Sequence, residues 1–153
     1  HFSTTLLEKI ELAWMCRPDL ISETDVLPLS KFRDIPLILQ PNNSSMRAMI
    51  NRLLDENGVR PKSVVSCNGT MALAEMAKAG LGITCLPKAY FMSEVAAGHL
   101  RVIETEPGVP GLLFAITTRR DTVGNLGATI SSLVEPLCDF SAKTRALGLY
   151  VAA

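Results

Sequence analysis

The stretch that decides the fold covers residues 71–87 and reads MALAEMAKAGLGITCLP. Residues 71–79 are rich in good helix formers. Gly80 is the residue type that commonly ends a helix, and the apolar run at 82–86 is typical of a buried strand. The stretch therefore predicts a helix, a tight turn and a strand. It also excludes Gly80-Leu81-Gly82 as a phosphate loop, because such a loop follows a strand and opens a helix.

The same alternation continues on both sides of this stretch. Short apolar runs predict strands at residues 12–16, 36–39, 63–66, 100–103 and 112–117. Helical spacing predicts helices that start near Ser45 and end at Gly58, cover residues 90–97, and cover residues 126–137, where Pro136 should shorten the helix. Strands that alternate with helices indicate an α/β domain with a mainly parallel sheet.

Composition narrows the class of protein. The chain has 153 residues, of which 48% are hydrophobic, enough for one domain with a real core. Lys plus Arg and Asp plus Glu each number 15, so the chain lacks the basic surface expected of a protein that grips nucleic acid by itself. No apolar stretch is long enough for a membrane span, and no signal peptide is evident. The chain opens with His1 rather than Met, which we interpret as a fragment of a longer protein.

The cysteines predict neither a metal site nor a disulfide framework. Each of the four stands alone, without a C-x-x-C pair or a neighbouring histidine pair. We expect them to be buried free thiols in a reducing cytosol. The positions are Cys16, Cys67, Cys85 and Cys138.

Two polar junctions are the candidate binding residues. Pro41-Asn42-Asn43-Ser44-Ser45 links a predicted strand to a predicted helix, and Cys67-Asn68-Gly69-Thr70 does the same. Free backbone N–H groups and the positive end of the helix dipole lie at such points, outside the carboxyl ends of the strands. On neighbouring strands they would line one pocket mouth suited to a carboxylate or another anion. Plain helix capping is the simpler alternative.

Catalytic chemistry has little support in the sequence. No serine lies in a G-x-S-x-G elbow, and no carboxylate pair lies at a strand end. His99 follows a turn without an evident partner, and Glu75 and Glu94 are most simply solvent-facing helix positions. We therefore predict no catalytic residue, no metal and no cofactor, and expect that the chain is not an enzyme.

Several motifs resemble the effector-binding domain of LysR-type transcriptional regulators. The strongest is Gly80-Leu81-Gly82-Ile83-x-x-Leu86-Pro87. Residues 35–39 followed by a polar cap and Arg47, the Leu54-x-x-x-Gly58-x-x-Pro61 run and Gly98-x-Leu100 also fit. Arg17-Pro18-Asp19 resembles the family's hinge, although Leu20-Ile21 departs from it. The resemblance covers about residues 5–140.

The resemblance implies a periplasmic-binding-protein-like fold of type II with an effector cleft between two subdomains. Residues 19–110 would form the second subdomain, nearly complete. Residues 1–18 would be part of the first subdomain and a crossing strand, residues 111–140 its return strand and helix, and residues 141–153 a tail. Carried over residue by residue, the cleft wall comprises Arg17, Asn43, Ser44, Ser45, Asn68, Gly69 and Thr70. Arg17 would favour an anionic effector.

The leading hypothesis is therefore the sensory part of a bacterial, cytoplasmic LysR-type regulator. A small effector, expected to be a carboxylate or another anion, would shift the two subdomains within a homo-oligomer. DNA would be bound only by another part of the protein, and no membrane would be involved. One alternative is a solute-binding protein of a transport system, which an export signal upstream would favour. A less favoured alternative is a small α/β enzyme, which would need a convergent nucleophile and base.

Overall fold

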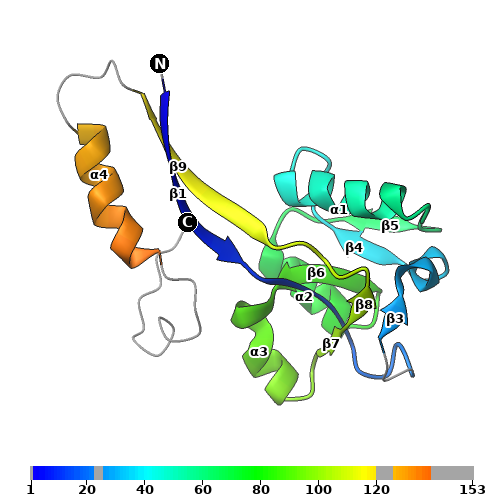
Figure 1. Cartoon of the computed structure of the whole chain (residues 1–153). Helices are drawn as coiled ribbons and strands as arrows, with labels where there is room; N and C mark the ends of the chain where they lie inside the picture. Colours follow the sequence, from blue (N-terminus) through cyan, green and yellow to red (C-terminus); the bar gives the residue numbers. More distant parts are fainter. Residues whose placement is uncertain (1, 23–25, 120–125, 139–153) are drawn as a thin grey trace. The chain divides into compact units, whose positions relative to one another are not determined.

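The computed structural model describes residues 2–22, 26–119 and 126–138. The predicted tail at 141–153 and the residue His1 lie outside this range. The chain divides into two compact units: unit 1 comprises His1–Ile10 and Gly111–Ala153, and unit 2 comprises Glu11–Pro110. Figure 1 draws both, and each is described here by itself.

Unit 2 alternates strands and helices as the sequence predicts. The helices are α1 (Ser45–Glu56), α2 (Thr70–Lys78) and α3 (Lys88–Ala96), with a short 3₁₀ helix η1 (Leu29–Arg33). The main strands are β2 (Leu12–Cys16), β4 (Leu37–Leu39), β5 (Val64–Ser66), β6 (Ile83–Pro87) and β7 (Arg101–Ile103). The predicted helices and strands of this unit are confirmed to within a few residues at their ends.

The central sheet of unit 2 is mixed, which corrects the prediction of a mainly parallel sheet. Its strand order is β5-β4-β6-β2-β7. The β5–β4 and β4–β6 pairs are parallel, whereas β2 pairs antiparallel with both β6 and β7. The sequence pattern could not reveal this, because β2 inserts between two strands that follow it by some 70 residues or more. Hydrophobic periodicity reports burial and not strand direction.

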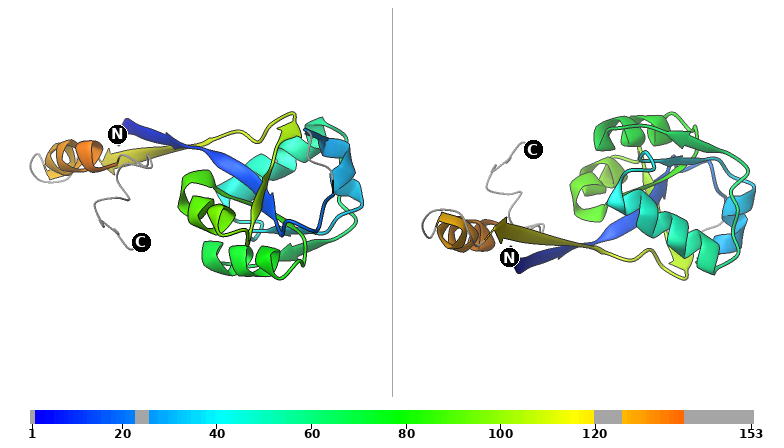
Figure 2. Two further views of the ribbon diagram at one scale, coloured as in Figure 1. Left: turned by 90° about the horizontal axis from the view of Figure 1, so that it is seen from below. Right: turned by 90° about the horizontal axis from the view of Figure 1, so that it is seen from above.

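Helices cover both faces of this sheet, as the two views in Figure 2 show. On the face covered by α2 and α3, the apolar core contains Met15, Ile38, Leu86, Leu73 and Phe91. On the other face, Trp14 meets Phe32 edge to face, with ring centroids 4.9 Å apart. Side chains alternate along each strand, so Ala13 and Met15 enter one core while Trp14 enters the other. The buried residues on both faces give unit 2 a core of its own, while β5 at the edge of the sheet stays exposed.

The turn between α2 and β6 follows from the glycine at its centre. Gly80 has φ of 80°, a left-handed conformation that disfavours side chains with a Cβ. The Gly80 amide donates to the Ala77 carbonyl and the Leu81 amide donates to the Met76 carbonyl, which is the pattern of a Schellman helix end. The turn delivers the chain directly into β6 and confirms the predicted helix, turn and strand.

A small parallel pair completes unit 2. It joins β3 (Leu27–Pro28) to β8 (Thr105–Glu106) and was not predicted, because two-residue strands carry no periodic signal. Thr105 is buried in this pair, and its hydroxyl donates to the Pro107 carbonyl at 2.8 Å.

Unit 1 is built on one long antiparallel ladder. Strand β1 (Phe2–Ile10) pairs with β9 (Leu112–Arg119), and an irregularity in register falls between Leu6 and Lys9. Helix α4 (Leu126–Val134) follows and continues as a 3₁₀ turn, η2 (Glu135–Leu137), so Pro136 ends the α-helix as expected. Among the described residues of this unit, none is classed as buried.

Candidate functional site

The candidate site is the carboxyl edge of β4, β5 and β6, three adjacent parallel strands of unit 2. Leu39 of β4 is level with Ser66 of β5, and the Cys67 amide donates to the Leu39 carbonyl at 3.1 Å. Each strand leads within a few residues to a helix, α1, α2 or α3. Three helix N-termini therefore converge on one edge, where their free N–H groups and dipoles favour an anion.

The first junction is a compact polar turn. The Ser44 amide donates to the Pro41 carbonyl at 3.0 Å, and Ser44 caps α1 by accepting from the Arg47 amide at 3.5 Å. The Ser44 hydroxyl in turn donates to the side-chain oxygen of Gln40. Asn43 and Ser45 are exposed. Capping therefore accounts for Ser44, while Asn43 and Ser45 leave their side chains to solvent.

A buried arginine lies directly behind this junction. Arg47 is only 9% exposed, and its Nε donates to the Asn51 side chain at 2.9 Å while Nη1 donates to the Gln40 carbonyl at 3.3 Å. Burial lowers the pKa of this guanidinium below its ordinary value, although it stays cationic at neutral pH. The Asn51 side chain and the Gln40 carbonyl are both neutral, so the charge of Arg47 adds to the positive end of α1.

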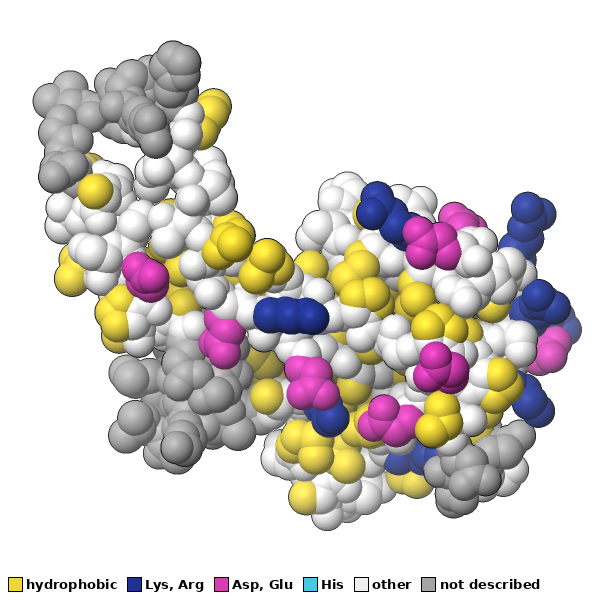
Figure 3. All heavy atoms as spheres, viewed as in Figure 1, with side chains coloured by type: hydrophobic (Ala, Val, Ile, Leu, Met, Phe, Trp, Pro, Cys, Tyr) yellow, Lys and Arg dark blue, Asp and Glu magenta, His cyan; other side chains and the backbone are white. Residues whose placement is uncertain are grey.

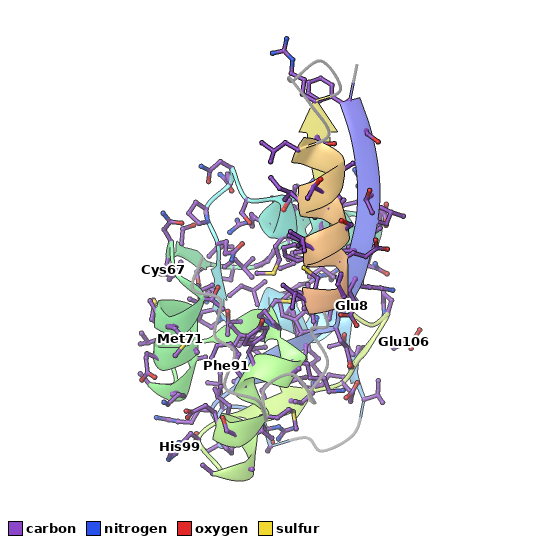
Figure 4. All side chains as sticks on the ribbon, turned by 90° about the vertical axis from the view of Figure 1, so that its left-hand side faces the viewer. Glu8, Cys67, Met71, Phe91, His99 and Glu106 are labelled. Carbon is purple, nitrogen blue, oxygen red and sulfur yellow. The ribbon has the colours of Figure 1, made fainter. Side chains whose placement is uncertain are left out.

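The second junction carries no side-chain cap. Gly69 is the N-cap of α2 and has no side chain to accept from the first turn, so helix capping does not explain this junction. Asn68 is exposed, and Gly69 and Thr70 are half-buried. Figure 4 labels Cys67 and Met71, which flank the junction on its two sides. The first-turn amides of α2 have no side-chain acceptor at the N-cap.

A third junction, which was not predicted from the sequence, lies at the start of α3. Lys88 is the first residue of this helix, and it follows β6 directly. Its amide donates to the Glu11 carbonyl at 2.9 Å, and its Nζ donates to Glu11 Oε1 at 2.8 Å. That hydrogen bond raises the pKa of Lys88 above its ordinary value of 10.5. The sequence did indicate a junction here, because the predicted strand at residues 82–86 is followed by a predicted helix at 90–97, as at the other two junctions.

Arg17 does not lie with the other predicted site residues. It follows β2, whose Met15 is level with Thr84 near the start of β6, so it lies at the opposite edge of the sheet. Its Nη1 points at the Ala79 carbonyl at 3.5 Å, and its Nε donates to Asp19. The length of α2, about 13 Å at 1.5 Å per residue, separates it from Thr70. Arg17 thus binds the C-terminal end of α2, and the reason is that β2 runs antiparallel to β6.

The expectations for His99 and Glu94 also change in the structure. His99 does have a partner, because its Nδ1 lies 3.0 Å from Glu94 Oε2. Glu94 also pairs with Lys78 at 3.1 Å, and these bonds lower the pKa of the Glu94 carboxyl. The partner was not visible in the sequence, since the turn after α3 folds His99 back onto its own helix.

Within residues 2–22, 26–119 and 126–138, no group of three or more His, Cys, Asp or Glu side chains could hold a metal ion.

The four cysteines are free thiols. Cys16 and Cys85 are buried, as predicted, whereas Cys67 and Cys138 are only half-buried. Burial raises the pKa of Cys16 to about 11 and also raises the pKa of Cys85. The two core thiols are therefore protonated and unreactive at neutral pH.

The family follows from comparison with known sequences. Residues 1–130 match the LysR substrate binding domain family. The chain belongs to this family. The predicted α/β fold of the periplasmic-binding-protein-like type II class is thereby confirmed, and the family match supports the predicted LysR effector domain over the solute-binding transport alternative.

A curated relative agrees with this family assignment. The chain is 31% identical over 85 residues to a RuBisCO operon transcriptional regulator of Acidithiobacillus ferrooxidans, which covers 56% of this chain and 27% of that protein. The chain thus spans about a quarter of the curated relative it matches.

Solved structures show the same fold. The regulatory domain of CcmR from Synechocystis PCC6803, in complex with 2-PG, has a TM-score of 0.77 at 14% identity, covering 91% of this chain and 68% of that one. The regulatory domain of MetR from N. meningitidis has a TM-score of 0.72 at 21% identity, covering 88% and 63%. None of the helices that the structure describes is long and apolar enough to cross a membrane.

Proposed function

We propose that this LysR-type domain binds a small anionic effector at the carboxyl edge of the unit 2 sheet. The residues we assign to the effector are Asn43, Ser44, Ser45, Asn68, Gly69 and Thr70. The proposal leaves out Arg17, which lies at the other edge and binds the end of α2.

The single observation that carries the proposal is the adjacency of the two junctions. They follow parallel neighbours in one sheet, tied together by the bond from the Cys67 amide to the Leu39 carbonyl. Parallel neighbours lie about 4.8 Å apart, so one small molecule can reach both helix starts. The uncapped first turn of α2 and the buried charge of Arg47 add positive potential there. Both favour a carboxylate or another anion over a neutral ligand.

The subdomain assignment also remains a proposal. We equate unit 2, which begins at Glu11 and not at the expected residue 19, with the second subdomain of the family, and unit 1 with part of the first. On this basis the effector cleft would have unit 2's carboxyl edge as one wall. The whole protein would be a cytoplasmic, oligomeric, non-enzymatic regulator that binds DNA through a part other than this chain. The CcmR complex with 2-PG supports the class of ligand, a small molecule.

Backbone amide shifts in an NMR titration test the site directly. A small carboxylate such as acetate should shift the amides of Ser45 and Thr70 in a saturable way, because these amides open α1 and α2. Thr70→Pro removes one of these donors at a first-turn position that proline tolerates. We expect it to weaken binding about ten- to a hundredfold, as the loss of one hydrogen bond to an anion would. The matched control, Ser63→Ala, lies before β5 at the far end of that strand and should leave binding unchanged.

The outcome that contradicts the proposal is specific. Saturable shifts confined to the Arg17 and Gly80 region, with Ser45 and Thr70 unmoved, would place the anion at the opposite edge of the sheet. Equal affinity in the wild type and Thr70→Pro would likewise remove α2 from the site.

A further inference from the structure

The carboxyl edge of unit 2 continues beyond the proposed effector site and changes its charge. Along the sheet order β5-β4-β6-β2-β7, the first three strands end at helix N-termini, and the third of these carries Lys88. Strand β2 runs the other way, so the residue that precedes it, Glu11, lies at the same edge, and Glu104 follows β7 there. The edge therefore has an electropositive part over α1, α2 and α3 and an acidic part at Glu11 and Glu104.

Lys88 stands where the two parts meet. It pairs through its side chain with Glu11 at 2.8 Å, and Glu104 is close enough to raise its pKa further. A lysine in the first turn of a helix opposes the helix dipole, which favours anions there. No acidic residue in the first turn of α3 offsets it, so the compensating carboxylate comes from Glu11, 77 residues away in sequence. The Glu11 carboxylate, just before β2, therefore compensates the positive charge of Lys88 at the start of α3.

The side-chain pair of Lys88 and Glu11 can open, so that another anion can replace the Glu11 carboxylate. The side chain of Glu11 is 70% exposed and that of Lys88 is 32% exposed, so water and solutes reach both. Exposed ion pairs contribute little to stability and are screened by salt. The backbone bond from the Lys88 amide to the Glu11 carbonyl holds the two residues together whether or not the side chains are paired. Breaking the side-chain pair therefore leaves the fold in place and frees an ammonium group at the edge.

We infer that Lys88 is an effector-binding residue and that Glu11 is its internal competitor, so that a ligand carboxylate or phosphate replaces the Glu11 carboxylate on Lys88. This inference rests on the proposed function, since it extends the same site by one strand. Lys88 follows β6, which is the direct neighbour of β4 and so of the first junction. The effector class that results is a small anion whose charged group reaches the α3 start while the rest contacts the α1 and α2 starts.

The exchange also bears on regulation. Glu11 is the first residue of unit 2, and Ile10, the last residue of the N-terminal segment of unit 1, precedes it directly. In the free state Glu11 is held to α3 by two hydrogen bonds, one from the Lys88 amide and one from its side chain. After exchange only the backbone bond remains. Ligand binding would therefore loosen the segment that leads from one unit into the other.

A phosphate titration of four variants tests the inference. Inorganic phosphate at low ionic strength is the probe, and the backbone amides of Ser45, Thr70 and Lys88 are followed by NMR. Glu11→Gln removes the competitor and should tighten binding about two- to fivefold, the worth of an exposed pair. Lys88→Gln removes the receptor and should weaken binding at least about tenfold. Lys88→Arg keeps the charge and should retain binding, and Glu56→Gln, at the far end of α1, should change nothing.

The outcomes separate this inference from the proposed function. If Ser45 and Thr70 shift with the same affinity in wild type, Glu11→Gln and Lys88→Gln, the proposed site stands and the exchange is overturned. If Lys88 alone shifts, and its affinity follows the predicted order, the exchange stands and the junction site is wrong. Weaker binding in Glu11→Gln than in wild type overturns the inference outright. Circular dichroism of each variant shows whether it is folded, and Lys88→Arg against Glu11→Gln still decides the matter if Lys88→Gln does not fold.

Discussion

Units 1 and 2 differ in how completely they bury their apolar side chains. In unit 2, both faces of the sheet are covered, and residues such as Trp14, Met15, Phe32 and Leu86 are almost inaccessible to water. In unit 1, the large apolar side chains that the structure describes stay at least partly in solvent, including Phe2, Leu6, Phe114, Ile130 and Leu133. Burial of apolar surface is the dominant favourable term in folding. Unit 2 can therefore stabilise itself, whereas the described part of unit 1 lacks a core.

The surface of the molecule shows the same contrast. On the face drawn in Figure 3, apolar side chains are visible over both units, while Lys, Arg, Asp and Glu side chains gather mainly over unit 2. Contiguous exposed apolar surface marks a contact region for other polypeptide. The exposed apolar side chains of unit 1 are candidates for such contacts, whereas unit 2 is the unit on which we propose the effector site.

The largest expected effect is on the core of unit 2. Trp14→Ala should lower the free energy of unfolding by about 3–5 kcal/mol, the usual cost of deleting a buried aromatic side chain. The indole N–H makes no hydrogen bond within the described part of the chain, so the loss is one of packing. Leu133→Ala in unit 1 is the control, and it should change stability by less than about 0.5 kcal/mol. Urea unfolding followed by circular dichroism measures both, and equal costs would abolish the contrast between the units.

The second largest difference between the units should be the reactivity of their cysteine thiols. Cys85 in unit 2 is almost fully buried, and burial raises its thiol pKa, so it reacts only when the core opens. Cys138 in unit 1 is half-buried. We expect iodoacetamide to modify Cys138 at least about 100-fold faster at pH 8, as measured by peptide mass spectrometry over time. Comparable rates would mean that unit 1 protects its thiol as well as unit 2 does.

A smaller effect concerns the turn that delivers β6. Gly80→Ala places a Cβ at a left-handed φ and 2.7 Å from Arg17 Cζ, so the flexible arginine must move. We expect a cost of about 1–2 kcal/mol. Gly98→Ala has a similar φ of 75° but open space around it, so it should cost about 1 kcal/mol. Thermal unfolding of both variants separates backbone strain from the Arg17 contact, and an equal loss would show that Arg17 moves freely.

The smallest effect is the pH dependence of an exposed ion-pair cluster in unit 2. Hydrogen bonds from His99 and Lys78 lower the pKa of Glu94 below its ordinary 4.5, so its contribution to stability is present above that value. The contribution is lost as the pH falls through the lowered pKa. The difference in urea midpoint between wild type and Glu94→Gln should therefore narrow below pH 4.5. A difference that stays constant down to pH 2 would show that the cluster does not titrate as described.

Much of unit 2 could be predicted from sequence because its elements are locally encoded. Gly80 ends α2 by its own conformational freedom, and the apolar stripe from Met46 to Leu54 marks the buried face of α1. The two polar junctions were found for the same reason, since a polar run between a strand and a helix is a local pattern. Lys88 was missed because β6 runs directly into α3, with no polar run between them to mark the junction.

Sequence by itself determined the order of strands and helices, the helix ends and the two junctions, because each depends on neighbouring residues. Only the tertiary structure decided which junctions lie together. The antiparallel insertion of β2 carries Arg17 to the far edge of the sheet and brings Glu11 to Lys88, 77 residues away in sequence. Strand direction and long-range charge pairing depend on how distant segments meet, and no local pattern records that.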